Sequence, residues 1–245
     1  MFTSQFREEV RDKIISKATS DFRIVSAAVI GSYASGTVDR WSDIDLTFGI
    51  DAAYTTNTLL ESWTAYIQNE FKGTVLFDVS SGSTVYRVFI LPGCLQVDLS
   101  FSPAIEFGAM GPHFNLLYGH QYEKPQYPAQ PNREIFGYLM HHLLRAKICS
   151  ERNKFWQAEV WIAEARNYAL KLACIAHGLN AYYGRGYDDL PVEIHNLFKE
   201  SFVRELSGEE ISRTLKIVVD GLPKISMEVK DYCLDFEETL RALGV

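Results

Sequence analysis

Three aspartates are spaced so that they could act together. Asp43 and Asp45 lie two residues apart in a segment, residues 43–50, that alternates acidic or small residues with large apolar ones, and Asp98 lies in a similar segment. Side chains of a strand alternate between its faces, so both carboxylates leave one face about 7 Å apart. If the strand of Asp98 lies beside theirs, three acidic side chains meet and repel one another. We therefore expect a cation there, and hard carboxylate oxygens suit Mg²⁺.

A glycine and a serine precede the paired aspartates. Gly31 and Ser32 close an apolar strand segment, and residues 33–42 separate them from Asp43. Glycine lets the backbone approach a phosphate closely, while the Ser32 hydroxyl and the N–H groups of a helical turn at 33–36 offer hydrogen-bond donors. Two Mg²⁺ ions about 3.5–4 Å apart would stabilise the attacking and leaving oxygens of an in-line phosphoryl displacement. Metal and phosphate sites together predict nucleotide chemistry.

Each of these features also has a purely structural interpretation. A lone Asp-x-Asp in a strand is more often a solvent-facing edge than a metal site, and a Gly-Ser pair after a strand is a weaker signal still. The joint pattern favours a site, because an apolar-Gly-Ser segment, a fixed spacer and two aspartates flanked by apolar residues occur in order.

This joint pattern resembles the DNA polymerase β-like nucleotidyltransferase superfamily. Its signature is apolar-Gly-Gly/Ser, a spacer of about ten residues, and Asp-apolar-Asp/Glu-apolar; Gly31-Ser32 and Asp43-Ile44-Asp45 match it, and Asp98 fits the third acidic strand. The layout, a small catalytic domain followed by a helical bundle, looks most like the nucleotidyltransferases that adenylylate aminoglycosides or lincosamides. The motif covers only residues 30–46 and Asp98.

The resemblance implies roles for these residues. Asp43 and Asp45 would ligate Mg²⁺, two ions being expected, and Gly31 with Ser32 would hold the triphosphate of ATP or another NTP. Asp98 would be either a metal ligand or the general base that takes the proton of the acceptor hydroxyl.

A predicted helix at 154–177 carries further candidates. Trp156, Glu159 and Arg166 fall on one of its faces. That face could line a cleft between domains, with Arg166 binding phosphate and Glu159 orienting or deprotonating the acceptor. Similar antibiotic-modifying enzymes use a bundle helix in this way, which implies Arg166 and Lys171 as nucleotide-binding residues. The alternative is that these charges are solvated or paired structurally.

The elements that position the three aspartates alternate along the first half of the chain. Periodicity predicts helices at 4–19 and 56–71, and strands at 23–30, 43–50, 74–79, 84–91 and 94–101. Pro92-Gly93 indicates an antiparallel hairpin between the last two strands. The prolines at about 119–133 predict a linker between a catalytic domain, 1–122, and a helical substrate-binding domain, 133–245.

The second half reads as helical, with helices at 134–151, 154–177, 191–206, 209–220 and 224–242 packed as a bundle. The predicted fold class is therefore α/β (α+β): a mixed-sheet nucleotidyltransferase fold followed by an all-α bundle.

Composition limits the partners. The 245 residues have 47% hydrophobic and 22% charged residues and a formal net charge of −7, which disfavours duplex nucleic acid and suits cations or a cationic small molecule. Four scattered cysteines without zinc spacing indicate buried thiols in a reducing compartment. The sequence shows neither a signal peptide nor a long apolar run. We expect a cytoplasmic protein without membrane contact; a homodimer stays an open alternative.

The predicted function is Mg²⁺-dependent transfer of a nucleoside monophosphate, AMP from ATP, to a hydroxyl of a small acceptor such as an aminoglycoside-like antibiotic. Two alternatives are kept: transfer to a protein or an RNA end, and a non-catalytic nucleotidyltransferase-like partner in a toxin–antitoxin type pair. Retention of all three aspartates argues against the non-catalytic alternative.

Overall fold

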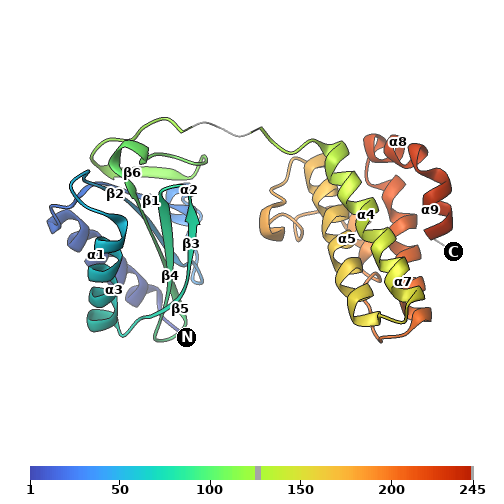
Figure 1. Cartoon of the computed structure of the whole chain (residues 1–245), viewed down its shortest axis with the longest axis horizontal. Coiled ribbons are helices and arrows are strands. Elements are labelled where there is room, and N and C mark those ends of the chain that lie inside the picture. The colour runs from blue at the N-terminus through green and yellow to red at the C-terminus, as the bar shows by residue number, and fades with distance from the viewer. Residues whose placement is uncertain (125–127, 244–245) are drawn as a thin grey trace. The chain divides into compact units, whose positions relative to one another are not determined.

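The computed structural model describes residues 1–124 and 128–243. It consists of two compact units, Met1–Tyr127 and Pro128–Val245 (Figure 1). The division falls within the range predicted for the linker, 119–133. Pro125, one of the prolines behind that prediction, lies outside the described residues. The catalytic and substrate-binding roles assigned to the two parts stay predictions.

The first unit is built around one mixed sheet. Its helices are α1 (Ser4–Ser20), α2 (Gly31–Ser35) and α3 (Thr56–Phe71), and its strands are β1 (Ile24–Ile30), β2 (Ile44–Ile50), β3 (Thr74–Ser81), β4 (Thr84–Leu91), β5 (Leu95–Pro103) and β6 (Phe114–Tyr118). The strand order is β3-β4-β5-β2-β1-β6. Strands β2 and β5 are parallel and the other neighbours are antiparallel, which confirms the predicted α+β fold class.

Helices α1 and α3 pack on one face of this sheet (Figure 1). From β2, Ile44, Leu46 and Phe48 point into that core, and the Phe48 ring lies 5.1 Å from the ring of Trp63 on α3. The alternating residues Asp45 and Thr47 are only half-buried. Because neighbours along a strand point to opposite faces, the apolar positions fix the orientation of Asp45 toward the other face.

Side-chain caps and apolar spacing explain the helices of this unit. Helix α1 begins after Thr3, whose hydroxyl oxygen accepts a hydrogen bond from the backbone N–H of Phe6 at 3.1 Å. Its buried Val10, Ile14 and Ala18 recur at four-residue spacing and form one apolar face. The sequence therefore determines both where α1 starts and which side of it meets the sheet.

The structure differs from the sequence prediction at three places in this unit. Strand β6, which pairs with β1, is absent from the sequence prediction, although its five residues, FNLLY, are mostly apolar; in the structure they are half-buried or exposed. Asp43 directly precedes β2 instead of lying inside it. Cys94 is exposed, because it lies in the turn between β4 and β5 with a φ of 66°; the other three cysteines are buried free thiols.

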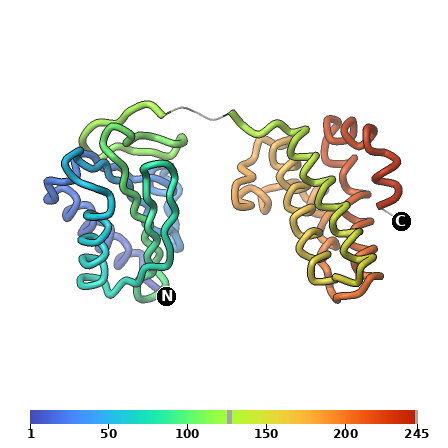
Figure 2. The backbone as a smooth tube through the Cα atoms, viewed as in Figure 1, coloured from blue at the N-terminus to red at the C-terminus, as the bar shows by residue number. Residues whose placement is uncertain are grey.

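The second unit is helical. Its helices are α4 (Asn132–Glu151), α5 (Phe155–Ala176), α6 (Val192–Phe198), α7 (Gly208–Gly221), α8 (Met227–Asp235) and α9 (Glu237–Leu243), with single 3-10 turns at Tyr182–Gly184 and Leu222–Lys224. Helices α4 and α5 run side by side over most of their length (Figure 2). Buried residues of these two helices, such as Phe136, Leu143 and Ile162, join those of α7 in one apolar core.

Two predicted helices of this unit are shorter than expected. The helix predicted at 191–206 ends at Phe198, and side chains then take over the hydrogen bonds of the following carbonyls: Arg166 donates to Ser201 O at 2.8 Å and Arg213 donates to Glu200 O at 2.8 Å. The helix predicted at 224–242 is interrupted at Phe236, whose ring packs against Phe136 of α4 at 5.8 Å. Tertiary contacts therefore determine where each of these two predicted helices ends.

None of the helices within residues 1–124 and 128–243 has the length and the apolar character that a membrane crossing requires.

Candidate active site

Two neighbouring strands bring the three aspartates together. Asp45 on β2 lies directly opposite Asp98 on β5 in the parallel register, and Asp43 directly precedes β2. Each of the three side chains is half-buried, and one carboxylate oxygen from each lies within 4.8 Å of the others. The predicted convergence of Asp43, Asp45 and Asp98 is therefore present in the structure.

Gly31 lies against this cluster and has no room for a side chain. Its φ of +65° belongs to the left-handed region, and a Cβ on it would lie 2.3 Å from Asp45 Oδ2. L-residues with a side chain rarely adopt this φ. Glycine is thus required for the backbone conformation and for the close approach of the chain to the carboxylate.

Ser32 follows in α2, directly after Gly31. Its Oγ is buried, and none of the described residues hydrogen-bonds to it. The neighbouring Ser35 hydroxyl is bonded to the carbonyl oxygens of Gly31 and Ser32, at 3.2 and 3.1 Å. A buried hydroxyl without a partner costs about 1–3 kcal/mol, so Ser32 is suited to donate a hydrogen bond to a bound ligand.

Burial changes the acidity of Asp98. The pKa of Asp98 is raised to about 6. Desolvation is the largest cause and raises the pKa, the hydrogen bonds from Gln96 lower it, and the charge of Asp43 raises it. Gln96 Nε2 donates to both carboxylate oxygens of Asp98, at 3.0 and 3.2 Å. Sequence reasoning missed Gln96, although its place two residues before Asp98 in the same strand puts both on one face.

This donor set fits a hard divalent cation. Three carboxylates that converge this closely repel one another, and a cation bound between them removes that repulsion. Gly31 brings the backbone close to Asp45, and the Ser32 hydroxyl beside it is a buried donor without a partner among the described residues. The arrangement can therefore hold a metal ion together with a phosphate.

The remaining predicted site residues lie on α5 of the second unit. Arg166 donates to Ser201 O at 2.8 Å, and its guanidinium lies 4.2 Å from the centre of the Phe202 ring. Burial lowers the pKa of Arg166 and the nearby Glu159 raises it. Lys171 Nζ donates to Gln130 Oε1 at 3.1 Å. Contacts inside the second unit thus engage Arg166 and Lys171. The catalytic role of Glu159 and the nucleotide-binding roles of Arg166 and Lys171 stay predictions.

Part of the first unit matches a known protein family. Residues 7–63 match the family model described as a nucleotidyltransferase domain, a span that contains Gly31, Ser32, Asp43 and Asp45. No curated protein matches the chain significantly.

Three solved structures are similar over most of the chain. An aminoglycoside 6-adenyltransferase from Bacillus subtilis is 13% identical, with 97% of this chain and 98% of that chain covered and a TM-score of 0.40. The polymerase core of TRAMP, an RNA surveillance complex, is 14% identical, with 90% and 59% covered and a TM-score of 0.32. The CdnE cyclic dinucleotide synthase of Elizabethkingia meningoseptica is 14% identical, with 91% and 84% covered and a TM-score of 0.28.

Proposed function

Because the chain carries a polymerase β-like nucleotidyltransferase domain in its first unit, we propose that it transfers a nucleoside monophosphate, AMP from ATP, to a hydroxyl of a small acceptor and releases pyrophosphate. The reaction is Mg²⁺-dependent in this proposal. One observation carries it: the oxygens of Asp43, Asp45 and Asp98 lie within 4.8 Å of one another, next to the glycine and the unpartnered serine that the motif predicts.

The reaction forms one bond and breaks another at the same phosphorus. The acceptor oxygen bonds to the α-phosphorus, the bond from that phosphorus to the oxygen that bridges to the β-phosphorus breaks, and pyrophosphate leaves. The proton of the hydroxyl passes to a base. Such a reaction needs positioning and charge neutralisation rather than covalent chemistry by the protein.

The residues of the first unit divide this work. Asp43 and Asp45 would hold Mg²⁺, which when bound neutralises the negative charge of the phosphates. The Ser32 hydroxyl, which has no partner among the described residues, would donate a hydrogen bond to a phosphate oxygen, and Gly31 lets the backbone pass close to Asp45. Asp98 either joins Asp43 and Asp45 as a ligand or takes the hydroxyl proton; a pKa of about 6 suits both, since Asp98 is then mostly ionised at pH 7.

The second unit supplies the acceptor site in this proposal. The net charge of −7 favours a cationic small molecule, such as an aminoglycoside-like compound, over duplex nucleic acid. On α5, Glu159 would orient the acceptor, and Arg166 and Lys171 would contact the nucleotide. The proposal keeps the cytoplasmic location expected from the unpaired cysteines and requires no membrane.

The test is pyrophosphate release from each NTP in the presence of Mg²⁺, measured against aminoglycosides, lincosamides and control proteins. Asp43→Asn/Asp45→Asn is the inactive variant, and we expect a loss of about 10³-fold or more, because several kcal/mol of charge stabilisation disappear. Asp51→Asn is the matched control, since Asp51 directly follows the other end of β2.

Release with one small-molecule class, lost in the double variant and kept in the control, supports the proposal. Release only with protein or RNA acceptors replaces the small-molecule part of it. Failure of the wild-type protein to bind or turn over any NTP overturns it.

A further inference from the structure

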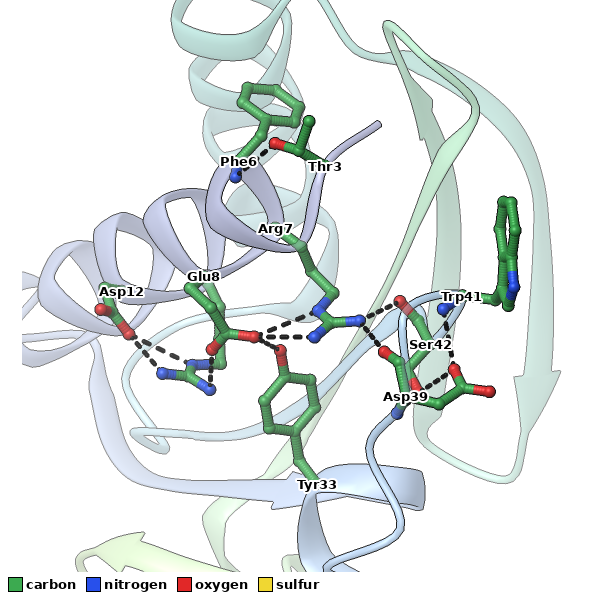
Figure 3. Close-up of polar contacts among 10 residues, drawn as sticks. Thr3, Phe6, Arg7, Glu8, Asp12, Tyr33, Asp39, Trp41 and Ser42 are labelled. Carbon is green, nitrogen blue, oxygen red and sulfur yellow. Dashed lines mark hydrogen bonds and ion pairs between the residues drawn. The ribbon is translucent and has the colours of Figure 1, made fainter. Parts of the chain in front are cut away.

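A buried arginine of α1 contacts the segment between the two halves of the motif. Arg7 is 3% exposed. Its Nη1 donates to the carbonyl oxygens of Asp39 and Ser42, the second at 3.3 Å (Figure 3). Its Nε and Nη2 donate to Glu8 Oε1 at 3.1 and 3.0 Å. One guanidinium thus joins the first turns of α1 to a loop far along the chain.

That loop, residues 36–42, leads directly into Asp43. Residues 36–41 are exposed, so few apolar contacts hold them. The loop has a compact form of its own, because Asp39 Oδ1 accepts hydrogen bonds from Trp41 N at 2.8 Å and from Ser42 Oγ at 3.0 Å. Arg7 anchors this turn through its carbonyl oxygens, at the residue next to Asp43.

The other half of the motif is attached to the same part of α1. Tyr33, which follows Ser32, donates a hydrogen bond from its hydroxyl to Glu8 Oε1 at 2.5 Å (Figure 3). Burial raises the pKa of Tyr33, and Glu8 raises it further, so the hydroxyl keeps its proton at neutral pH. Burial raises the pKa of Glu8, but the hydrogen bonds from Tyr33 and Arg7 bring it below its ordinary value. Glu8 is therefore a charged acceptor that links Tyr33 to Arg7, which in turn holds the loop that leads to Asp43.

We propose that Arg7 is a positioning residue for nucleotidyl transfer: with Glu8 and Tyr33 it fixes the carboxylate of Asp43 relative to Gly31 and Ser32. This inference rests on the function proposed above. Arg7 touches no reacting group in this scheme and acts only through the loop that ends at Asp43.

The shape of the guanidinium suits this role. Its donors form a rigid planar fork, so one side chain reaches two carbonyl oxygens and one carboxylate at once, whereas a lysine ammonium is a point charge on a flexible stem. Arg11 also pairs with Glu8, through Nη1 and Oε2 at 2.5 Å. Glu8 therefore keeps a cationic partner when Arg7 is replaced, so a variant at Arg7 leaves no unpaired acid behind.

The experiment compares Arg7→Met and Arg7→Lys with a matched control, Arg87→Met. Arg87 is also a well-bonded arginine of the first unit: it donates to Asp78 at 2.7 and 2.6 Å and to Thr64 Oγ1 at 2.7 Å. It has no hydrogen bond to residues 36–45 among those described. Each protein is measured for amide hydrogen exchange of residues 37–43, for binding of Mn²⁺ alone by electron paramagnetic resonance, for kcat against Mg²⁺ concentration, and for Tm.

In Arg7→Met we expect exchange in 37–43 to speed up about 10-fold while the strands exchange as before. Mn²⁺ binding weakens several-fold, and kcat falls about 10–100-fold, because a displacement near 1 Å costs about 10²-fold. Part of this loss is recovered at high Mg²⁺, and Arg7→Lys lies between Arg7→Met and the wild type. Arg87→Met changes Tm but leaves loop exchange, Mn²⁺ binding and kcat at wild-type values.

Equal behaviour of Arg7→Met and Arg87→Met, with Tm as the only change, would refute the positioning role. If the wild-type protein neither binds Mn²⁺ nor releases pyrophosphate, the proposed function fails and the positioning role fails with it. Wild-type turnover with an unaffected Arg7→Met refutes the role of Arg7 alone. If Arg7→Met does not fold, Arg7→Lys, which keeps the charge, is compared with the wild type and with Arg87→Met in the same measurements.

Discussion

The candidate site residues are arranged differently in the two units. In the first, three carboxylates of like sign converge within 4.8 Å, and the buried hydroxyl of Ser32 in the same motif has no partner among the described residues. In the second, Arg166 and Lys171 each donate to an oxygen of their own unit. Like charges that lie close together and a buried donor without a partner lower the free energy of unfolding, and a bound ligand can restore it. Arg166 and Lys171 already have hydrogen-bond partners.

This difference indicates where a bound ligand would stabilise the protein most. The arrangement in the first unit is poor for stability and suited to a metal and a phosphate. The contacts on α5 also serve the bundle, since Arg166 covers a carbonyl oxygen released where α6 ends. Variants of Gly31 and Ser32 should therefore alter turnover more than stability, whereas loss of Arg166 should alter stability more than turnover.

Among the single substitutions that test this comparison, the largest effect is expected from Gly31→Ala, with Gly36→Ala as its control. Both glycines have left-handed φ values, +65° and +70°, but a Cβ at Gly31 would meet Asp45 Oδ2 at 2.3 Å, whereas a Cβ at Gly36 would meet nothing within 4 Å. Each variant should lose about 1–2 kcal/mol of unfolding free energy from backbone strain. Only Gly31→Ala should also lose turnover, by about 10²-fold or more, because Asp45 is displaced.

Chemical denaturation and pyrophosphate release on the same preparations separate the two effects. Equal loss of turnover in both variants would show that the backbone conformation matters and that the close approach to Asp45 does not.

Which residues of this site could be predicted from the sequence depends on how far apart in the chain the interacting residues lie. Asp43, Asp45 and Asp98 were predicted, because the alternation within strands and the motif spacing are local signals, and the family match confirms the resemblance. Arg7 was not, since its contact with Ser42 exists only once α1 docks against a loop 35 residues away. The bundle helices followed their periodicity, except at Phe198 and Phe236, where tertiary contacts end them.

Ser32→Ala tests whether the buried hydroxyl of the first unit serves a ligand or the fold. If the Ser32 hydroxyl donates to a phosphate, its removal costs a hydrogen bond to a charged group and should lower kcat/KM for NTP about 10–100-fold. Because that hydroxyl has no partner among the described residues, the free energy of unfolding without ligand should stay the same or rise. Steady-state kinetics and denaturation check both; a destabilised variant with normal kinetics would mean that Ser32 has a structural partner.

Asp98→Asn tests the cost of the acidic cluster through its pH dependence. Burial raises the pKa of Asp98 from 3.8 to about 6, so the folded protein holds this proton more tightly than the unfolded chain. The charge of Asp98 therefore does not lower the free energy of unfolding below about pH 4, and it lowers it fully above pH 6. In EDTA, Asp98→Asn should be more stable than the wild type by about 2 kcal/mol at pH 8 and equal to it near pH 4.

Asp78→Asn should show the opposite sign. The hydrogen bond from Arg87 is the main cause that lowers the pKa of Asp78, so its charge stabilises the fold above its ordinary pKa of 3.8. Stability curves of Asp98→Asn and the wild type that coincide at all pH values would mean that the cluster carries no strain, and the contrast between the two units would disappear.

The smallest effect is expected from Lys171→Met on α5. If Lys171 contacts the nucleotide in addition to Gln130, its loss removes one solvent-screened charge contact worth at most about 1 kcal/mol, so KM for NTP should rise about 3–5-fold at constant kcat. Lys147→Met is the control, because Lys147 pairs with Glu151 on α4 at 2.8 Å and has no predicted ligand. An unchanged KM in Lys171→Met would contradict the predicted contact between Lys171 and the nucleotide and would leave Arg166 as the basic residue of α5 to be tested for it.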